Sequence, residues 1–327
     1  MGNTVLDVKN LLTQYYTNGG VIKAVDDVSF SIPKGQTVCL VGESGCGKSA
    51  VAMSIMGLID GGSGGIKNGE ILFEGKDLLK LKKHELRQLR GNDISMIFQE
   101  PMTSLNPVLT IGGQIMEPLM EHELISKKEA KKRALELIEL VGIGRAEEIF
   151  NSYPHQLSGG MLQRIMIAIA LACSPNLLIA DEPTTALDVT IQAQILDLLR
   201  SLKEQRDMSM LLITHDLGVV AEVADYVIVM YAGKVIEEGP VVELFKNPKH
   251  PYTKGLLKAK PVINQRQEEL YTIAGQVPNL ATLTPSCYFS ERCEQCMAIC
   301  KEQMPKINDL DNGQRVACWL YEEVTTV

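Results

Sequence analysis

The chain has 327 residues, of which 45% are hydrophobic and 22% charged, so a fibre or a wholly disordered chain is excluded. Forty acidic and 32 basic side chains give a net charge of −8, which argues against nucleic-acid binding, because Lys and Arg carry the affinity for phosphate backbones. No run approaches the roughly 20 apolar residues of a membrane span, and the N-terminus lacks the pattern of a secretory signal. We therefore expect a cytosolic chain.

The first 245 residues alternate between short apolar runs and stretches with helical spacing. Residues 5–32 and 70–73 are typical of an antiparallel layer. Buried strands are predicted where continuous apolar runs occur, over residues 37–41, 177–180 and 210–213. Helices are predicted where apolar residues recur every three or four positions, over residues 50–58, 127–141, 161–173 and 191–202. This alternation predicts an α/β fold with a parallel sheet between layers of helices.

After about residue 245 the composition changes, because prolines become frequent and long helical patterns become rare. We therefore predict two domains, one over residues 1–245 and a small irregular C-terminal extension over residues 246–327.

A phosphate-binding loop is predicted directly after the strand at residues 37–41. Residues 42–49 fit the pattern G-x-x-x-x-G-K-[ST], and a helix is expected to begin at Ala50. Glycines let backbone N–H groups point at phosphates, Lys48 would reach the β- and γ-phosphates, and the Ser49 hydroxyl would bind Mg²⁺. A chance match is the alternative. The residues assigned to the nucleotide here are Gly42, Ser44, Gly45, Cys46, Gly47, Lys48, Ser49 and Ala50.

Two carboxylates end the apolar strand at residues 177–180. In a phosphate-loop protein, Asp181 can hold Mg²⁺ and Glu182 can orient or deprotonate the attacking water. Taken alone, the pair would be better explained as a solvated strand end.

A short Ser-Gly-Gly segment, Ser158-Gly159-Gly160, precedes the predicted helix at 161–173 and could be a plain turn. It resembles the signature loop of ATP-binding-cassette (ABC) ATPases, and their other motifs follow in the expected order. Gln99 lies in a segment similar to the Q-loop, residues 184–188 look like the D-loop, and His215 looks like the switch histidine.

The resemblance covers about residues 5–245 and implies a phosphate-loop, RecA-like core with an antiparallel β subdomain and a helical subdomain at about residues 100–165. It implies that two cassettes meet head to tail, with ATP between the phosphate loop of one and Ser158, Gly159 and Gly160 of the other. Gln99 would sense the γ-phosphate and Mg²⁺, and His215 would help to hold the water. Tyr15 would stack on adenine, with Tyr16 as the rival.

Longer stretches look like the dipeptide, oligopeptide and nickel importer branch of that family: residues 98–107, 153–161 and 250–257. This implies an ATPase subunit at the cytoplasmic face of the membrane. Its partners would be a homologous second ATPase subunit or a second copy, two integral-membrane permeases and, indirectly, an extracellular substrate-binding protein. The alternative is a soluble ABC ATPase that acts on nucleic acid or ribosomes.

The C-terminal cysteines also resemble a motif of that branch. Cys287, Cys293, Cys300 and Cys318 match its spacing, which implies a [4Fe–4S] cluster on four thiolates. Cys296 makes the pattern ambiguous, since a Cys-x-x-Cys pair could instead serve zinc, and free buried cysteines are the third reading.

Overall fold

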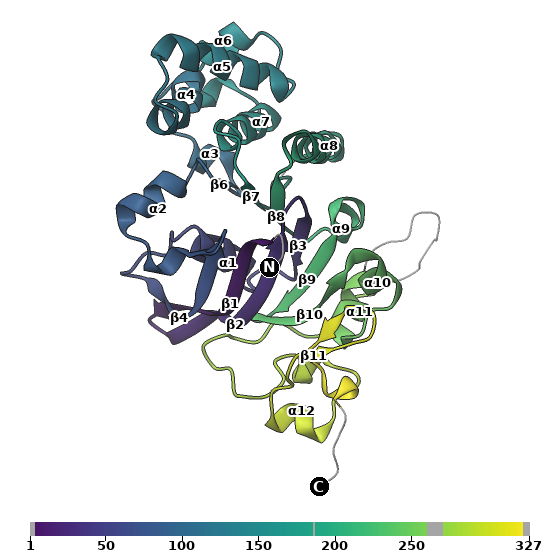
Figure 1. The fold of residues 1–327 in the computed structure, drawn as a ribbon. Coiled ribbons are helices and arrows are strands. Elements are labelled where there is room, and N and C mark those ends of the chain that lie inside the picture. The colour runs from purple at the N-terminus through teal and green to yellow at the C-terminus, as the bar shows by residue number, and fades with distance from the viewer. Residues whose placement is uncertain (1–3, 186, 260–270, 323–327) are drawn as a thin grey trace. The chain divides into compact units, whose positions relative to one another are not determined.

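The computed structural model describes residues 4–185, 187–259 and 271–322 (Figure 1). These residues divide into two compact units that are interleaved along the chain. The first unit holds residues 4–6, Ile32–Thr37 and Phe73–Ile213. The second holds Asp7–Ser31, Val38–Leu72 and the described residues from Thr214 onward. Ala186, within the segment that looks like the D-loop, lies outside the described residues.

Parallel strands form the core of the first unit. Strand β7 (Leu177–Asp181) lies between β6 (Ile94–Ile97) and β8 (Ser209–Thr214), with Leu178 opposite both Ser95 and Met210. Every residue of these strands is buried, as expected for parallel strands covered on both faces. The strands predicted at 177–180 and 210–213 are confirmed.

Helices make up most of the remainder of the first unit. Their bounds are α2 (Lys83–Leu89), α3 (Pro101–Ser104), α4 (Ile111–His122), α5 (Lys127–Leu140), α6 (Ala146–Asn151), α7 (Gly159–Ala170) and α8 (Val189–Arg206). Helices α4, α5 and α6 pack together (Figure 1). Helix α5 begins after Ser126, whose hydroxyl accepts the Glu129 N–H at 3.3 Å, and it buries one apolar face. The smaller elements of this unit are β5 (Lys76–Asp77), η1 (Leu78–Lys80) and η2 (Pro154–Gln156).

The second unit contains most of a layer of long strands. Strands β2 (Gly20–Pro33), β1 (Thr4–Thr17) and β4 (Gly64–Phe73) lie side by side in this order. A buried hydrogen bond of 2.8 Å between the Thr13 and Ser54 hydroxyls joins β1 to helix α1 (Lys48–Ile55). The predicted layer at residues 5–32 is therefore present.

A mixed sheet completes the second unit. Strand β3 (Thr37–Val41) pairs in parallel with β9 (Tyr226–Tyr231), which pairs antiparallel with β10 (Lys234–Pro240). Strands β12 (Arg315–Val316) and β11 (Asn308–Asp309) continue the sheet, so the C-terminal segment adds its own strands next to β10. Besides α1, the described helices of this unit are α9 (Leu217–Val223), α10 (Val241–Lys246), α11 (Pro251–Lys258), η3 (Ser290–Arg292), α12 (Ala298–Glu302) and η4 (Trp319–Tyr321).

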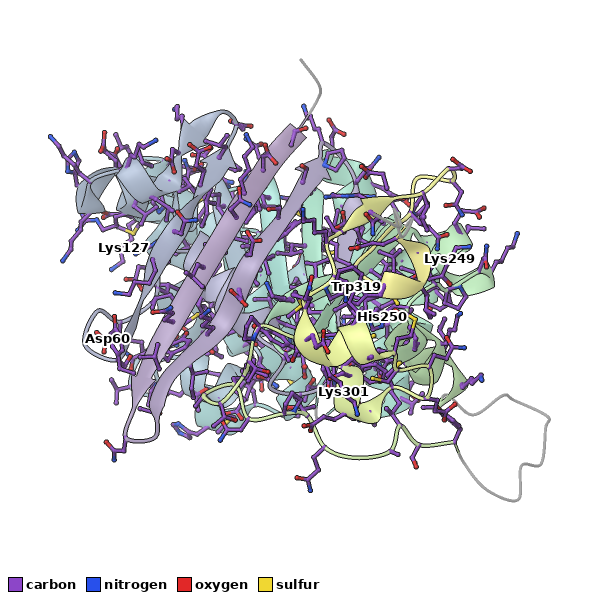
Figure 2. All side chains as sticks on the ribbon, turned by 90° about the horizontal axis from the view of Figure 1, so that it is seen from below. Asp60, Lys127, Lys249, His250, Lys301 and Trp319 are labelled. Atoms are coloured by element: carbon purple, nitrogen blue, oxygen red, sulfur yellow. The ribbon has the colours of Figure 1, made fainter. Side chains whose placement is uncertain are left out.

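Hydrogen bonds also attach the C-terminal segment to neighbouring turns. The Trp319 indole N–H donates to the Gln303 carbonyl at 3.1 Å, and the Tyr321 hydroxyl donates to the Lys249 carbonyl at 3.2 Å. Figure 2 shows Trp319 and Lys301 on this segment, which is drawn in yellow. The expected α/β class is confirmed, whereas the division into domains at residue 245 stays a prediction.

Within the described ranges, no helix has both the length and the apolar composition that a crossing of the bilayer requires.

Candidate nucleotide site

The phosphate loop lies between β3 and α1, in the strand–loop–helix context that its sequence pattern predicts. All residues of β3 are buried, and α1 begins at Lys48. Gly47 has φ +105°, and a Cβ atom there would lie 2.0 Å from the Ala24 carbonyl oxygen. Only glycine leaves room for the Ala24 carbonyl at this position, so the tight turn into α1 requires Gly47.

Lys48 lies inside the loop and is 5% exposed. Its Nζ donates to the carbonyl oxygens of Gly42 at 2.9 Å and of Glu43 at 3.1 Å. Ser44, Gly45 and Ser49 are exposed, whereas Cys46 is buried, and burial raises the pKa of its thiol. The donor set therefore fits a triphosphate: exposed loop residues and a buried ammonium at the positive end of a helix, with a serine hydroxyl for Mg²⁺.

In the first unit, Glu182 follows β7 directly, after the buried Asp181. Its φ is +47°, and its N–H donates to the Ile213 carbonyl at 2.9 Å. One oxygen of its carboxylate accepts the Gln99 side-chain N–H at 3.1 Å and the Thr185 hydroxyl at 2.8 Å. The structure therefore brings together Gln99 and Glu182, two of the predicted residues.

Thr185 was not among the predicted site residues. The sequence does contain a signal for this role. Thr185 lies three positions after Glu182, a spacing that allows the threonine hydroxyl to reach the Glu182 carboxylate.

The Ser-Gly-Gly segment forms the start of α7 in the first unit. Ser158 is the N-cap, and its hydroxyl accepts the Met161 N–H at 3.4 Å. Ser158 and Gly159 are exposed. An exposed helix N-terminus with its cap is suited to meet an anion.

The remaining predicted residues lie in the second unit. His215 is exposed and follows β8, just before Asp216, whose carboxylate caps α9 by accepting the Gly218 N–H at 2.7 Å. Tyr15 is half-buried on β1, and burial raises its pKa, whereas Tyr16 is 45% exposed. The choice of Tyr15 for adenine stacking stays a prediction.

The predicted iron–sulfur site is wrong. Among residues 4–185, 187–259 and 271–322, no group of three or more His, Cys, Asp or Glu side chains could hold a metal ion. Burial raises the pKa of Cys287 to about 12 and that of Cys318 to about 11. The finding overturns the assignment of a [4Fe–4S] cluster to Cys287, Cys293, Cys300 and Cys318, and it removes the zinc alternative as well.

Comparison with known proteins decides the family. The model of a family described as "ABC transporter" matches residues 25–185. The oligopeptide transport ATP-binding protein AppD of Bacillus subtilis is 54% identical over 321 residues, which cover 98% of each chain. The chain belongs to the ABC transporter family. A second model, "Oligopeptide/dipeptide transporter, C-terminal region", matches residues 236–300 and places this ABC protein in the peptide-importer branch.

Other relatives of this ABC protein support the same family. The dipeptide transport ATP-binding protein DppD of Bacillus subtilis is 51% identical, over 98% of this chain and 95% of that protein. Among solved structures, the ADP- and phosphate-bound dimer of the ATP-binding cassette MJ0796 has a TM-score of 0.65 and 31% identity, over 72% of this chain and 98% of that chain. The expected RecA-like fold is confirmed. As an ABC ATPase, the protein uses ATP and Mg²⁺.

Proposed function

We propose that this ABC ATPase is the ATP-hydrolysing subunit of a membrane importer of peptides. The observation that carries the proposal is the match along almost the whole chain to oligopeptide and dipeptide transport ATP-binding proteins, including the separate C-terminal region at residues 236–300. These names favour the importer over a soluble ATPase that acts on nucleic acid or ribosomes. The net charge of −8 points the same way.

The phosphate loop binds the nucleotide in this proposal. Gly42, Ser44, Gly45, Cys46, Gly47, Lys48, Ser49 and Ala50 surround the phosphates. Lys48 neutralises phosphate charge, and the Ser49 hydroxyl, Gln99 and Asp181 hold Mg²⁺. The metal ion supplies charge neutralisation on the transferred phosphoryl group. Tyr15 stacks on the adenine ring.

Glu182 acts on the attacking water. Its carboxylate is held by the Gln99 amide and the Thr185 hydroxyl, so the oxygens that would accept a water proton have a defined orientation. The positive φ of Glu182 is a strained conformation for a residue with a side chain, and strain of this kind is typical of catalytic positions. His215 assists in holding the water.

Two cassettes close over the nucleotide in head-to-tail order. Ser158, Gly159 and Gly160 offer the exposed N-terminus of α7 to the γ-phosphate bound by the other cassette. The other cassette is a homologous ATPase subunit or a second copy of this chain. ATP binding shifts the pair toward the closed dimer, and hydrolysis releases it.

The dimer works at the cytoplasmic face of the membrane against two permease subunits, and an extracellular binding protein delivers the peptide to them. In this arrangement residues 1–245 form the motor domain, with a helical subdomain at about residues 100–165, and residues 246–327 form the extension typical of the branch.

The test is the variant Glu182→Gln, which keeps the size of the side chain and removes its charge. We expect MgATP binding close to wild type, ATPase turnover lower by about 100-fold or more, and a dimer that persists with MgATP in size-exclusion chromatography with light scattering. The matched control adds Ser158→Arg to the same chain, which should abolish that dimer. Normal turnover by Glu182→Gln would refute the role of Glu182.

A further inference from the structure

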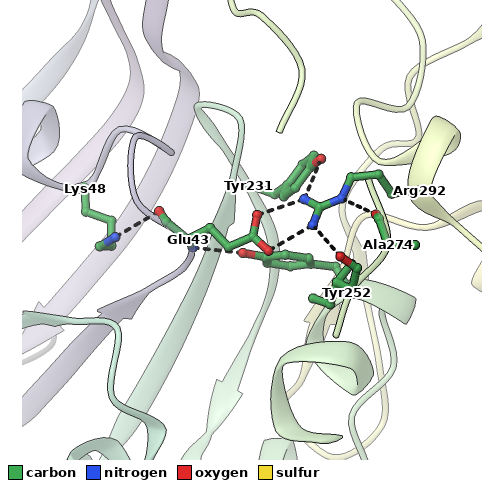
Figure 3. A network of polar contacts seen from close by, with 7 residues as sticks. Glu43, Lys48, Tyr231, Tyr252, Ala274 and Arg292 are labelled. Atoms are coloured by element: carbon green, nitrogen blue, oxygen red, sulfur yellow. Dashed lines mark hydrogen bonds and ion pairs between the residues drawn. The ribbon is translucent and has the colours of Figure 1, made fainter. Parts of the chain in front are cut away.

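Glu43, the second residue of the phosphate loop, is bound by the C-terminal part of the chain (Figure 3). Its backbone N–H donates to the Tyr252 hydroxyl at 2.9 Å. Its carboxylate accepts two N–H groups of Arg292, at 2.8 and 3.1 Å. Its carbonyl oxygen accepts the Lys48 ammonium at 3.1 Å. The chain separations are 209 residues to Tyr252 and 249 to Arg292, and all four residues belong to the second unit.

Arg292 is held on every side, and its side chain is 6% exposed. Its other N–H groups donate to the carbonyl oxygens of Ala274 at 2.9 Å and Ile273 at 3.3 Å, and to the Tyr231 hydroxyl at 3.3 Å. The hydrogen bonds from the guanidinium to the Glu43 carboxylate raise the pKa of Arg292, which keeps it charged. The planar guanidinium of Arg can form a bidentate hydrogen-bonded pair with a carboxylate, which the ammonium of Lys cannot.

Tyr252 is equally well anchored. It is fully buried, and its ring packs edge-on against Tyr231, with ring centroids 4.7 Å apart, and against Phe289, at 5.4 Å. Tyr231 ends β9, and Tyr252 lies on α11. The partners of Glu43 are therefore rigid, since each is packed among aromatic rings or backbone carbonyls.

Glu43 thus connects Lys48 to the C-terminal part of the chain. The Glu43 carbonyl oxygen contacts Lys48, while the N–H and the side chain of Glu43 are held by Tyr252 and Arg292. A change in the position of Arg292 therefore moves the backbone of the loop and, with it, an acceptor of the lysine.

We propose that Arg292 is a positioning residue for the nucleotide site, and that through Glu43 it makes nucleotide affinity depend on the C-terminal extension. This rests on the proposed function, in which Lys48 holds the phosphates of ATP. A purely structural role for the ion pair would change the stability of the chain and leave nucleotide affinity unchanged.

The test is a double-mutant cycle with Arg292→Gln, Glu43→Gln and both together, made in the full chain. The probe is a fluorescent N-methylanthraniloyl ATP with Mg²⁺, and thermal unfolding is followed in parallel. We expect each single variant to raise the Kd by about tenfold, and the double variant to raise it no further, because the two residues act as one unit. Arg292→Lys keeps the positive charge but cannot form the bidentate pair, so its Kd should fall between those of wild type and Arg292→Gln.

Arg315→Gln is the matched control. Arg315 forms another ion pair of the C-terminal segment, with the buried Glu238, and this pair joins β12 to β10. The variant should lower the unfolding temperature and leave the Kd within twofold of wild type.

Lys48→Ala separates the two hypotheses. If Lys48→Ala binds nucleotide as well as wild type, the proposed nucleotide site fails. If Lys48→Ala loses binding while Glu43→Gln and Arg292→Lys keep the wild-type Kd, the role of Arg292 is overturned and the nucleotide site stands. Should Arg292→Gln fail to fold, the Kd values of Glu43→Gln and Arg292→Lys alone test the role of Arg292.

Discussion

At the level of single residues, His250 shows how burial changes the chemistry of an ordinary side chain. It is 2% exposed and caps α11, where its ring Nδ1 accepts the Tyr252 N–H at 3.1 Å, and its backbone N–H donates to the Glu237 carboxylate at 2.8 Å. His250 is labelled in Figure 2. Burial, with a smaller contribution from Lys254, lowers the pKa of His250 to about 3 from its usual 6.5.

We predict that His250 lowers the stability of the chain in acid. Between about pH 6.5 and pH 3 the unfolded chain is protonated at His250 and the folded chain is not, so the free energy of unfolding falls as the pH is lowered. The slope from one proton is at most about 1.4 kcal/mol per pH unit. Urea unfolding of wild type and His250→Asn at pH 7 and pH 4.5 measures it, since Asn keeps a capping oxygen.

Burial raises the pKa of the neighbouring Glu237, which acts in the opposite sense, because the folded state then binds the proton more tightly. Glu237 is present in both proteins, so the difference between their pH profiles isolates His250. Equal losses of stability in acid for both proteins would contradict the prediction.

At the level of elements, a close contact between helices sets the packing of α4 against α6. A Cβ atom on Gly112 of α4 would lie 2.3 Å from the ring of Phe150 on α6. Gly112→Ala should therefore lower the free energy of unfolding by about 1–3 kcal/mol, although Ala is the better helix former. Gly113→Ala is the matched control, because its Cβ would meet only the Thr110 hydroxyl, at 3.2 Å. Urea denaturation of both variants measures the difference, and a Gly112→Ala protein as stable as wild type would refute it.

At the level of the whole molecule, nucleotide binding should stabilise the fold. A ligand that binds only the folded state at 100 times its Kd adds about 2.7 kcal/mol to the free energy of unfolding. We predict that MgATP raises the thermal unfolding temperature of the wild-type chain by several degrees, measured by differential scanning fluorimetry. The Lys48→Ala protein should show no such shift, and an equal shift in both proteins would mean that the nucleotide binds elsewhere.

Local patterns were enough to predict the strands at residues 177–180 and 210–213, the helix that begins after Ser126, and the strand–loop–helix setting of Lys48. In each case the cause lies within a few residues: an apolar run, a capping side chain, or a glycine with a positive φ. The motif order likewise predicted the family, because each motif is read over adjacent positions.

Other features depended on which distant residues meet. Nothing near Glu43 in the chain points to Arg292, and the role of Thr185 became visible only in its hydrogen bond to Glu182. The metal site failed for a related reason: cysteine spacing describes order along the chain, whereas ligation needs side chains that the fold arranges around one ion. The sequence by itself determined the phosphate loop, the two acids Asp181 and Glu182 at the end of β7 and the family, since short-range sterics and hydrogen bonding encode them. Only the tertiary structure decided what holds Glu43 and Glu182 in place and how the C-terminal thiols behave, because packing between remote segments sets distances, burial and charge.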